Sequence, residues 1–208
     1  MTLQPMFISL DPDETLEQRI YQYKSEVREL VGDQLFLADP PHLTVYLSVF
    51  ADEEAVVSAI ESQRAKFQID SLNIVGWHIF EADPLNGNNT LVCQIDDLAV
   101  DTLRRLQSNV ISTVSNLRDT AATCARFEPR WQALTEEQRS CVTQQGFPYV
   151  GDGWHPHFTI ASIRQDAWAA VEAELIPNPP QLTASCPSMT VYRLVHEEPE
   201  VVRKIDLT

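Results

Sequence analysis

The chain has 208 residues, of which 44% are hydrophobic and 22% are charged. These values are ordinary for a globular protein with a buried core, and no apolar run approaches the roughly 20 residues that a membrane span needs. The formal net charge of -15, from 15 basic and 30 acidic residues, excludes the broad basic surface with which proteins bind DNA or long RNA. A small anion remains acceptable, because a few local donors in a cleft can outweigh a distant, screened field.

The cysteines and the first residues favour an intracellular chain without a metal-binding motif. Cys93, Cys124, Cys141 and Cys186 are far apart and form no C-x-x-C pair, so we interpret them as reduced, mostly packed thiols. Residues 1–14 become acidic at once and have no basic n-region, which a secretory signal requires. We therefore expect a cytoplasmic protein.

The first part of the chain alternates short strands with amphipathic helices. In chain order we expect a strand over 6–10, a helix capped near Asp11-Pro12-Asp13 and running to about Val31, a strand over 42–50, a helix over 53–64, alternating strand segments between 67 and 95 with a turn over 83–89, and a helix from Asp96 or Asp97 to about Leu117. Gly32 closes the first helix.

The second part begins with the least regular segment, over 118–153. Thr135-Glu136-Glu137-Gln138 resembles a capping box and predicts one short helix over 135–145, and the rest of the segment is predicted as loop. The order of the first part then returns: a strand at 157, a helix over 166–175, and strands over 182–185, 189–195 and 201–207. Three prolines separate that helix from the last strands.

One five-residue pattern occurs twice, as Pro41-His42-Leu43-Thr44-Val45 and as Pro156-His157-Phe158-Thr159-Ile160. If each copy is a strand, the side-chain period of two places His and Thr on one face and the apolar residues on the other. The His and Thr positions then lie roughly 6.6 Å apart along the strand. Each half repeats strand, helix and further strands around its own copy, so the sequence indicates a duplication.

We therefore predict a single α+β domain over 1–208, built as a pseudo-symmetric duplication with two lobes. Antiparallel sheets line a central groove, and helices lie outside. One lobe is expected to combine roughly residues 1–50 with elements of 157–208, and the other to hold 51–117. The segment over about 118–153 is an irregular insertion.

Two histidines and two threonines that face one another supply what the hydrolysis of a phosphate ester needs. One proton must leave water and one must reach the departing oxygen, and a pKa near ~6.5 lets one imidazole be neutral while the other is protonated. Threonine hydroxyls donate hydrogen bonds to the non-bridging oxygens, where charge builds in the transition state. The sequence does not assign the base and the acid, nor the ester bond that breaks.

With these motifs the sequence resembles the 2H phosphoesterase superfamily, whose mark is two H-x-[S/T]-x motifs. Its members include bacterial 2′-5′ RNA ligase-like proteins and cyclic nucleotide phosphodiesterases. The matching segments are His42-Leu43-Thr44-Val45 and His157-Phe158-Thr159-Ile160, and the element order over nearly the whole chain fits the family's two-lobed fold. The resemblance implies catalysis by His42 and His157, phosphate binding by Thr44 and Thr159, and neither a metal nor another cofactor. The two histidines are farther apart in sequence than in compact members.

Several aromatic residues near the motifs are candidates for contacts with substrate. Tyr46 continues the alternation of the first motif, so it is expected to line the groove, with ordinary packing as the alternative. Trp154 and Tyr149, with Phe147, lie in the loop that leads into the second motif. They form a lid or stacking surface in one interpretation and pack within the loop in the other.

The remaining polar candidates are interpreted as structural or surface residues. His155 and His157 make an H-x-H pair, but no third ligand is evident, so we expect His155 to be a loop histidine rather than a metal ligand. Arg164 is expected to be a solvated surface residue rather than an anion ligand. His78 and His196 have no partner that the sequence can name.

We expect a metal-independent cyclic phosphodiesterase that opens the 2′,3′-cyclic phosphate of a nucleotide or a short RNA end. The acidic composition favours a small substrate over a tRNA-sized one, and we expect a monomer that binds neither DNA nor membrane. Two alternatives stay open. One is a non-catalytic module that binds nucleotides or RNA ends, and the other is a 2′-5′ RNA ligase-like activity on larger RNA.

Overall fold

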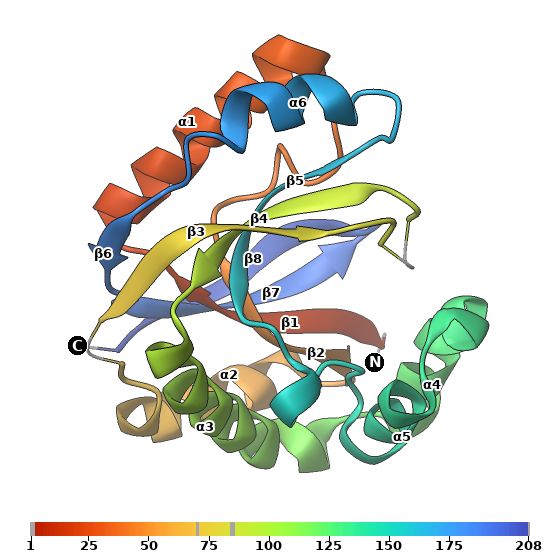
Figure 1. Cartoon of the computed structure of the whole chain (residues 1–208). Coiled ribbons are helices and arrows are strands. Elements are labelled where there is room, and N and C mark those ends of the chain that lie inside the picture. Colours follow the sequence, from red (N-terminus) through yellow and green to blue (C-terminus); the bar gives the residue numbers. More distant parts are fainter. Residues whose placement is uncertain (1–2, 70, 84–85, 208) are drawn as a thin grey trace.

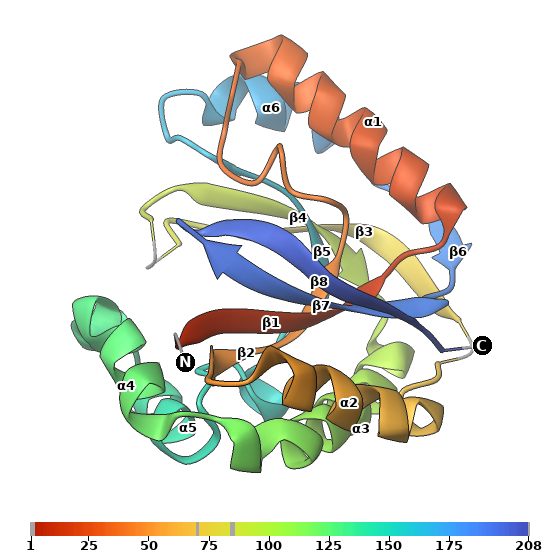
Figure 2. The same ribbon diagram turned by 180° about the vertical axis from the view of Figure 1, so that it is seen from behind.

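The computed structural model describes residues 3–69, 71–83 and 86–207, and Figures 1 and 2 show it from opposite sides. The strands are β1 (Gln4–Asp11), β2 (Leu43–Phe50), β3 (Leu72–Phe80), β4 (Asn89–Ile95), β5 (His157–Ile163), β6 (Leu182–Ala184), β7 (Ser188–Val195) and β8 (Glu198–Asp206). The α-helices are α1 (Glu14–Val31), α2 (Glu53–Gln63), α3 (Asp97–Val114), α4 (Thr120–Phe127), α5 (Glu136–Gln145) and α6 (Trp168–Leu175). Short 3-10 helices lie at Arg64–Lys66, Ser115–Leu117, Glu128–Ala133 and Gly151–Gly153.

The strands form two antiparallel sheets, with the orders β2-β1-β7-β8 and β5-β4-β3-β6. Both strands that carry a motif, β2 and β5, are therefore edge strands of their sheets. They contact each other where the two sheets meet. The expected α+β fold with two antiparallel lobes and outer helices is confirmed (Figure 1).

The long helix of each half covers the sheet of the other half. Helix α1 packs with α6 beside β5 and β6, on the outer side of the second sheet, although it follows β1 of the first. Helix α3 packs with α2 beside β2 of the first sheet, although it follows β4 of the second. The two layers are thereby connected by chain crossings as well as by packing.

Aspartate caps begin both long helices, as the sequence predicts. A side-chain oxygen of Asp13 accepts a hydrogen bond from the Leu16 amide at 3.0 Å, and Asp96 accepts one from the Ala99 amide at 3.2 Å. Such a cap stabilises a helix by about 1 kcal/mol. Helix α1 ends at Gly32, whose φ of 73° lies in the left-handed region that favours glycine.

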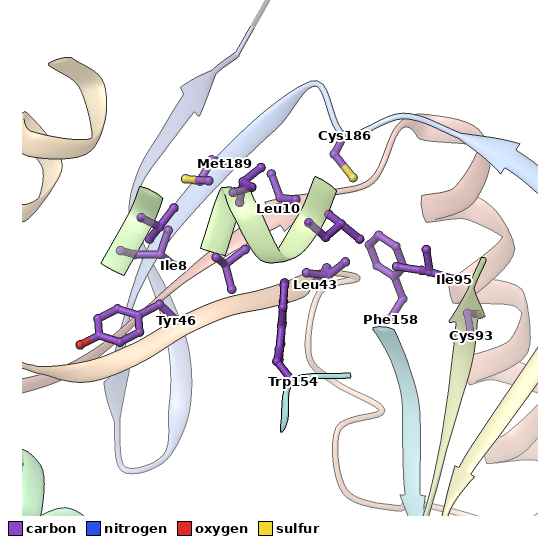
Figure 3. Close-up of a cluster of buried hydrophobic side chains, with 14 of the residues drawn as sticks. Ile8, Leu10, Leu43, Tyr46, Cys93, Ile95, Trp154, Phe158, Cys186 and Met189 are labelled. Carbon is purple, nitrogen blue, oxygen red and sulfur yellow. The ribbon is translucent and has the colours of Figure 1, made fainter. Parts of the chain in front are cut away.

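Apolar side chains from both sheets and from the helices form a continuous core, part of which Figure 3 shows. The apolar residues of the motifs belong to it: Leu43, Val45, Phe158 and Ile160 are completely buried. Burial of an aliphatic or aromatic side chain stabilises the fold by about 1.5–3 kcal/mol. The apolar face of each motif therefore anchors the strand from which the polar face projects.

The segment 118–153 is more regular than the sequence predicts. The capping box at Thr135 is confirmed and begins α5, but helix α4 replaces part of the predicted loop. The sequence offers little sign of α4, because the buried residues of its eight positions are only Thr123 and Phe127. The helix is held by tertiary contacts, in which the Thr123 hydroxyl bonds the Ser48 hydroxyl at 3.0 Å and accepts from the Val49 amide at 3.2 Å.

The prediction groups elements of 157–208 with roughly 1–50, and in the structure the strands from residue 157 onward divide between the two sheets. Strands β7 and β8 join β1 and β2, but β5 pairs with β4, and β6 pairs with β3. The alternation of a strand shows which face it buries, not which neighbour it pairs with. Positions 84 and 85 of the predicted turn over 83–89 lie outside the described residues. In the described part of the chain, no helix is long and apolar enough to cross a membrane.

Candidate active site

The two motifs have the alternation that the sequence predicts. Thr44 and Thr159 are half-buried, whereas the apolar residues on either side of each are completely buried. Thr44 lies opposite Ser9 of β1, and Thr159 lies opposite Val92 of β4. Among the described residues, neither threonine hydroxyl has a hydrogen-bond partner within the protein. Both hydroxyls are therefore available to a ligand.

The two motif histidines are held in the same way. Nδ1 of His42 lies 2.7 Å from the carbonyl oxygen of Pro40, and Nδ1 of His157 lies 2.6 Å from the carbonyl oxygen of His155. A carbonyl oxygen only accepts, so Nδ1 must carry a proton and donate it. In the neutral ring Nε2 is then unprotonated, and it is the atom that can take up or deliver a proton.

His42 lies against an aromatic pair on the first sheet. Its ring centroid is 5.1 Å from that of Phe7 and 6.0 Å from that of Tyr192, and those two rings stack with centroids 4.6 Å apart. Burial and the charge of Lys24 lower the pKa of His42, while the hydrogen bond to the carbonyl of Pro40 and the charges of Asp39 and Asp11 act in the opposite direction. His42 is thus the motif histidine with carboxylates nearby.

The carboxylate of Asp11 belongs to a polar row on the same sheet. Its Oδ2 accepts hydrogen bonds from the Ser188 hydroxyl at 2.8 Å and the Thr190 hydroxyl at 2.7 Å, and the Lys204 ammonium lies 3.8 Å from it. Asp11 is buried, and these donors satisfy its Oδ2, while its Oδ1 has no hydrogen-bond partner among the described residues. The row places a carboxyl group on the side of His42 with a cation at its edge.

His157 lies among other imidazoles on the second sheet. Its ring centroid is 5.1 Å from that of Phe80 and 6.2 Å from that of His155, which in turn stacks on His78 at 4.3 Å. Burial lowers the pKa of His157 to about 4, with further lowering by His155, His42 and His78. The strands that carry the two motifs, β2 and β5, contact each other.

Tyr46 does not share the face of the first motif, so the prediction that it lines the groove is wrong. A β-bulge shifts the register between β1 and β2: Ser9 pairs with Thr44, but the next residue back, Ile8, pairs with Tyr46. Tyr46 therefore turns into the core, where it is completely buried (Figure 3). Its hydroxyl donates to the carbonyl of Gln145 at 2.5 Å.

The aromatic residues before the second motif pack rather than form a lid. Trp154 is 4% exposed and Phe147 is 8% exposed, and both belong to the core, so the stacking role predicted for them is wrong. The loop places them inside because it folds back over α3. Tyr149 is half-buried, and burial raises the pKa of its phenol. Its contact with substrate stays a prediction.

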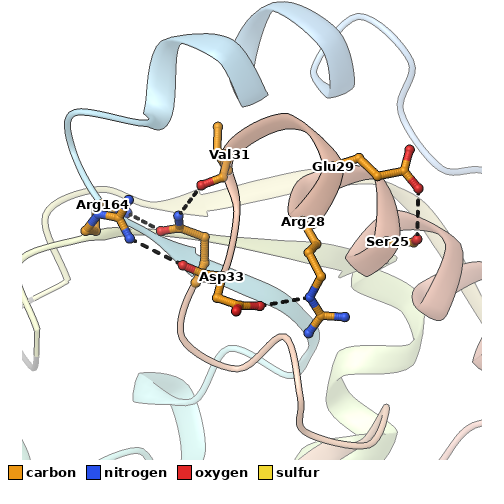
Figure 4. Close-up of polar contacts among 7 residues, drawn as sticks. Ser25, Arg28, Glu29, Val31, Asp33 and Arg164 are labelled. Carbon is orange, nitrogen blue, oxygen red and sulfur yellow. Dashed lines mark hydrogen bonds and ion pairs between the residues drawn. The ribbon is translucent and has the colours of Figure 1, made fainter.

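Arg164 is a surface residue, as expected. Its guanidinium donates to the Asp33 carbonyl at 3.3 Å (Figure 4). The guanidinium also pairs with the Asp166 carboxylate at 3.4 Å. The ring of His155 packs against the rings of His78 and Phe80. Within the described ranges, no group of three or more His, Cys, Asp or Glu side chains is arranged to hold a metal ion.

Sequence reasoning missed the aromatic surroundings of both motif histidines. Phe7 and Tyr192 come from β1 and β7, and they meet because those strands pair. Phe80 and His78 are two residues apart on β3, so the side-chain period of two was a signal that they share a face. Nothing local indicated that this face lies beside the second motif.

Comparison with known proteins identifies the family of the chain. The family model described as the 2'-5' RNA ligase superfamily matches residues 12–198. The chain belongs to this superfamily. The resemblance to the 2H phosphoesterases that the two H-x-T motifs indicate is thereby confirmed. No curated protein matches the chain by sequence.

Solved structures share the fold of this superfamily member at low sequence identity. The protein TT0787 of Thermus thermophilus is 16% identical, with a TM-score of 0.59 over 98% of this chain and 97% of its own. Escherichia coli LigT complexed with NADP+ is 14% identical, with a TM-score of 0.54 over 100% of this chain and 99% of its own. LigT complexed with 3'-AMP is also 14% identical, with a TM-score of 0.53 over the same shares.

Proposed function

We propose that the protein is a metal-independent cyclic phosphodiesterase that opens the 2′,3′-cyclic phosphate of a nucleotide or a short RNA end. The observation that carries the proposal is the contact between two equivalent H-x-T edge strands of different sheets. In each motif a carbonyl before the strand accepts from Nδ1 of the histidine, and the threonine hydroxyl has no hydrogen-bond partner among the described residues. Membership of a superfamily of ligases and phosphoesterases supports the enzyme class.

The charges around the two rings favour one assignment of roles. His157 is surrounded by imidazoles and has no carboxylate among the described groups that act on it, so it stays neutral and serves as the general base. His42 has Asp39 and Asp11 nearby, and the anionic phosphate of a bound substrate raises its pKa further. His42 therefore serves as the general acid.

In the proposed reaction, Nε2 of His157 takes a proton from water, and the water oxygen attacks phosphorus. The bond from phosphorus to one ribose oxygen breaks, and His42 delivers a proton to that oxygen, which leaves a phosphomonoester. Thr44 and Thr159 donate hydrogen bonds to the non-bridging oxygens, where negative charge increases during attack. Product analysis identifies whether the 2′ or the 3′ oxygen departs.

A small substrate is favoured over a long RNA. The net charge of -15 repels a polyanion, whereas one phosphate meets only local groups. The structures of E. coli LigT with 3'-AMP, ATP and NADP+ show that a protein with this fold accepts nucleotides. We propose a monomeric, cytoplasmic enzyme that requires neither DNA nor membrane.

Two other functions remain candidates for specific reasons. The name of the superfamily favours a 2'-5' RNA ligase-like activity on larger RNA, which predicts salt-sensitive RNA binding. The depressed pKa values of both histidines favour a non-catalytic nucleotide-binding module, because neither ring is readily protonated without ligand. Ligand-dependent stabilisation without product formation would identify that module.

The proposal is tested with purified protein treated with a chelator and incubated with the four 2′,3′-cyclic nucleotides. Products are resolved chromatographically for the wild type and for the matched series H42N, H157N and H196N. His196 lies in the exposed turn between β7 and β8 with a φ of 53°, a conformation that asparagine tolerates. We expect turnover by the wild type and H196N, and a loss of about 10²–10⁴-fold in H42N and H157N. Full turnover by both motif variants would overturn the mechanism.

A further inference from the structure

The two long helices carry buried polar side chains at equivalent positions. Helices α1 and α3 are each 18 residues long and begin after Asp13 and Asp96. Lys24 and Gln107 stand at the same distance from these caps along their helices. Lys24 is 3% exposed and Gln107 is 1% exposed, although both helices otherwise bury apolar residues. A polar group is costly at such a position unless it is hydrogen-bonded.

Lys24 holds the loop that leads into the first motif. Its Nζ donates to the carbonyl of Phe36 and, at 3.0 Å, to the carbonyl of Asp39. The residue after Asp39 is Pro40, whose carbonyl accepts the Nδ1 hydrogen of His42. The carbonyl held by Lys24 and the carbonyl that orients the ring therefore belong to consecutive residues.

Gln107 makes the corresponding contacts before the second motif. Its Nε2 donates to the carbonyl of Tyr149 at 3.0 Å, and its Oε1 accepts from the Gly151 amide at 3.1 Å. These residues belong to the segment that leads to His157. The same Nε2 also donates at 3.0 Å to the carbonyl of Val45, the neighbour of Thr44 in the first motif. Gln107 is thus bonded to the first motif itself and to the approach of the second.

The crossed arrangement of the helices gives these contacts a structural consequence. Lys24 stands on α1, which packs beside β5 and β6 of the second sheet, but it holds the loop that enters β2 of the first. Gln107 stands on α3, which packs beside β2 of the first sheet, but it holds the loop that enters β5 of the second. Each side chain therefore connects one layer to the motif of the other.

We propose that Lys24 and Gln107 are equivalent positioning residues of the two repeats, which fix the placement of the motif histidines relative to each other. Lys24 sets the position of His42, and Gln107 sets that of His157. Neither touches the substrate in this proposal. The kinetic consequence rests on the proposed function, because a displacement of either imidazole by about 1 Å costs a proton-transfer step up to about 10²-fold.

The experiment compares K24M and Q107M, in which methionine keeps the length of the side chain and removes the donors. Q22M on α1 and N109M on α3 are the controls, because both positions are exposed. The pKa values of the histidines are measured by NMR, with resonances assigned from the His-to-Asn variants. Turnover of a 2′,3′-cyclic nucleotide is measured alongside, and kcat is separated from KM.

We expect a reciprocal pattern. K24M shifts the titration of His42 by about half a pH unit or more and leaves His157 unchanged. Q107M shifts the titration of His157 by as much and that of His42 by less, because Gln107 also bonds Val45 of the first motif. In both variants kcat falls about 10- to 100-fold while KM changes less than about twofold. Both K24M and K24Q remove the ammonium charge that lowers the pKa of His42, so the difference between these two variants isolates the positioning contribution. K24Q, which offers an amide donor in place of the ammonium, recovers most of the loss in kcat. The controls behave as the wild type.

Variants that lower the melting temperature while both histidines titrate as in the wild type would overturn the proposal, since that is what a merely structural role predicts. If K24M or Q107M does not fold, K24N or Q107N takes its place under the same criterion, because each keeps a polar side chain but shortens its reach to the loop carbonyls. The titrations need no turnover. A protein without phosphodiesterase activity would therefore refute the proposed function and still leave the positioning proposal to be decided by NMR.

Discussion

The replacement H157N is expected to reduce the loss of stability on mild acidification. Burial and three neighbouring imidazoles lower the pKa of His157 from 6.5 to about 4, so the folded protein binds this proton less readily than the unfolded chain. The stabilising contribution is complete above pH 6.5 and is lost as the pH falls toward 4, because the unfolded state then binds the extra proton. The wild type should therefore lose stability in this window through His157, and the variant should not.

The size of the effect follows from the two pKa values. Between pH 7.5 and 5.5, proton linkage with pKa values of 4 and 6.5 changes the free energy of unfolding by about 1.4 kcal/mol. The ring is half-buried rather than completely enclosed, so solvent screening reduces the expected difference to about 0.7–1.4 kcal/mol. The lower pH stays clear of the isoelectric point near 4.6, where the protein would associate.

The assay is urea unfolding of the wild type, H157N and H196N at both pH values. On going from pH 7.5 to 5.5, the free energy of unfolding of the wild type and of H196N should fall by about 0.7–1.4 kcal/mol more than that of H157N. The slope of the free energy against urea concentration should be the same in all three proteins. Equal pH dependence in all three proteins would show that His157 is not held neutral by its surroundings. The pKa reasoning behind its role as the base would then fail.

Three further predictions concern single side chains. T44V and T159V should each lower kcat by about 10²–10³-fold, because each removes a hydrogen-bond donor to the transition state. The control T183V on β6 should keep the wild-type kcat. Equal kcat in all three variants would exclude phosphate binding by the hydroxyls of Thr44 and Thr159. Y46F should destabilise the protein by about 1 kcal/mol in urea unfolding, because it removes a buried hydrogen bond, and it should leave KM unchanged. A raised KM would instead indicate that Tyr46 contacts the substrate. D119A should cost about 1 kcal/mol by removing the cap of α4, and an unchanged unfolding curve would contradict that cap.

Features of this fold that depend on near neighbours in sequence could be predicted. The Asp13 and Asp96 caps, the capping box at Thr135 and the periodic apolar residues of α1 and α3 gave helices in the right places. The motif alternation was equally local, because apolar residues flank each threonine. These features need no knowledge of which elements meet.

Features that depend on pairing between distant segments could not be predicted. The bulge opposite Ile8 and Ser9 turns Tyr46 away from Thr44, and no alternation within β2 shows it. The stack of His78 on His155 arises because β3 and β5 flank β4 in one sheet. Lys24 looked like an ordinary helix residue, and only the loop that covers it explains its burial.

The central claim is that His42 and His157 act together on one phosphorus atom. The most direct measurement is a double-mutant cycle on the turnover of a 2′,3′-cyclic nucleotide by the wild type, H42N, H157N and the variant with both replacements. Residues that act as a unit are strongly non-additive, so we expect the double variant to be about as slow as the slower single variant. If the two losses multiply, or if either single variant turns over at the wild-type rate, the histidines do not share one reaction centre.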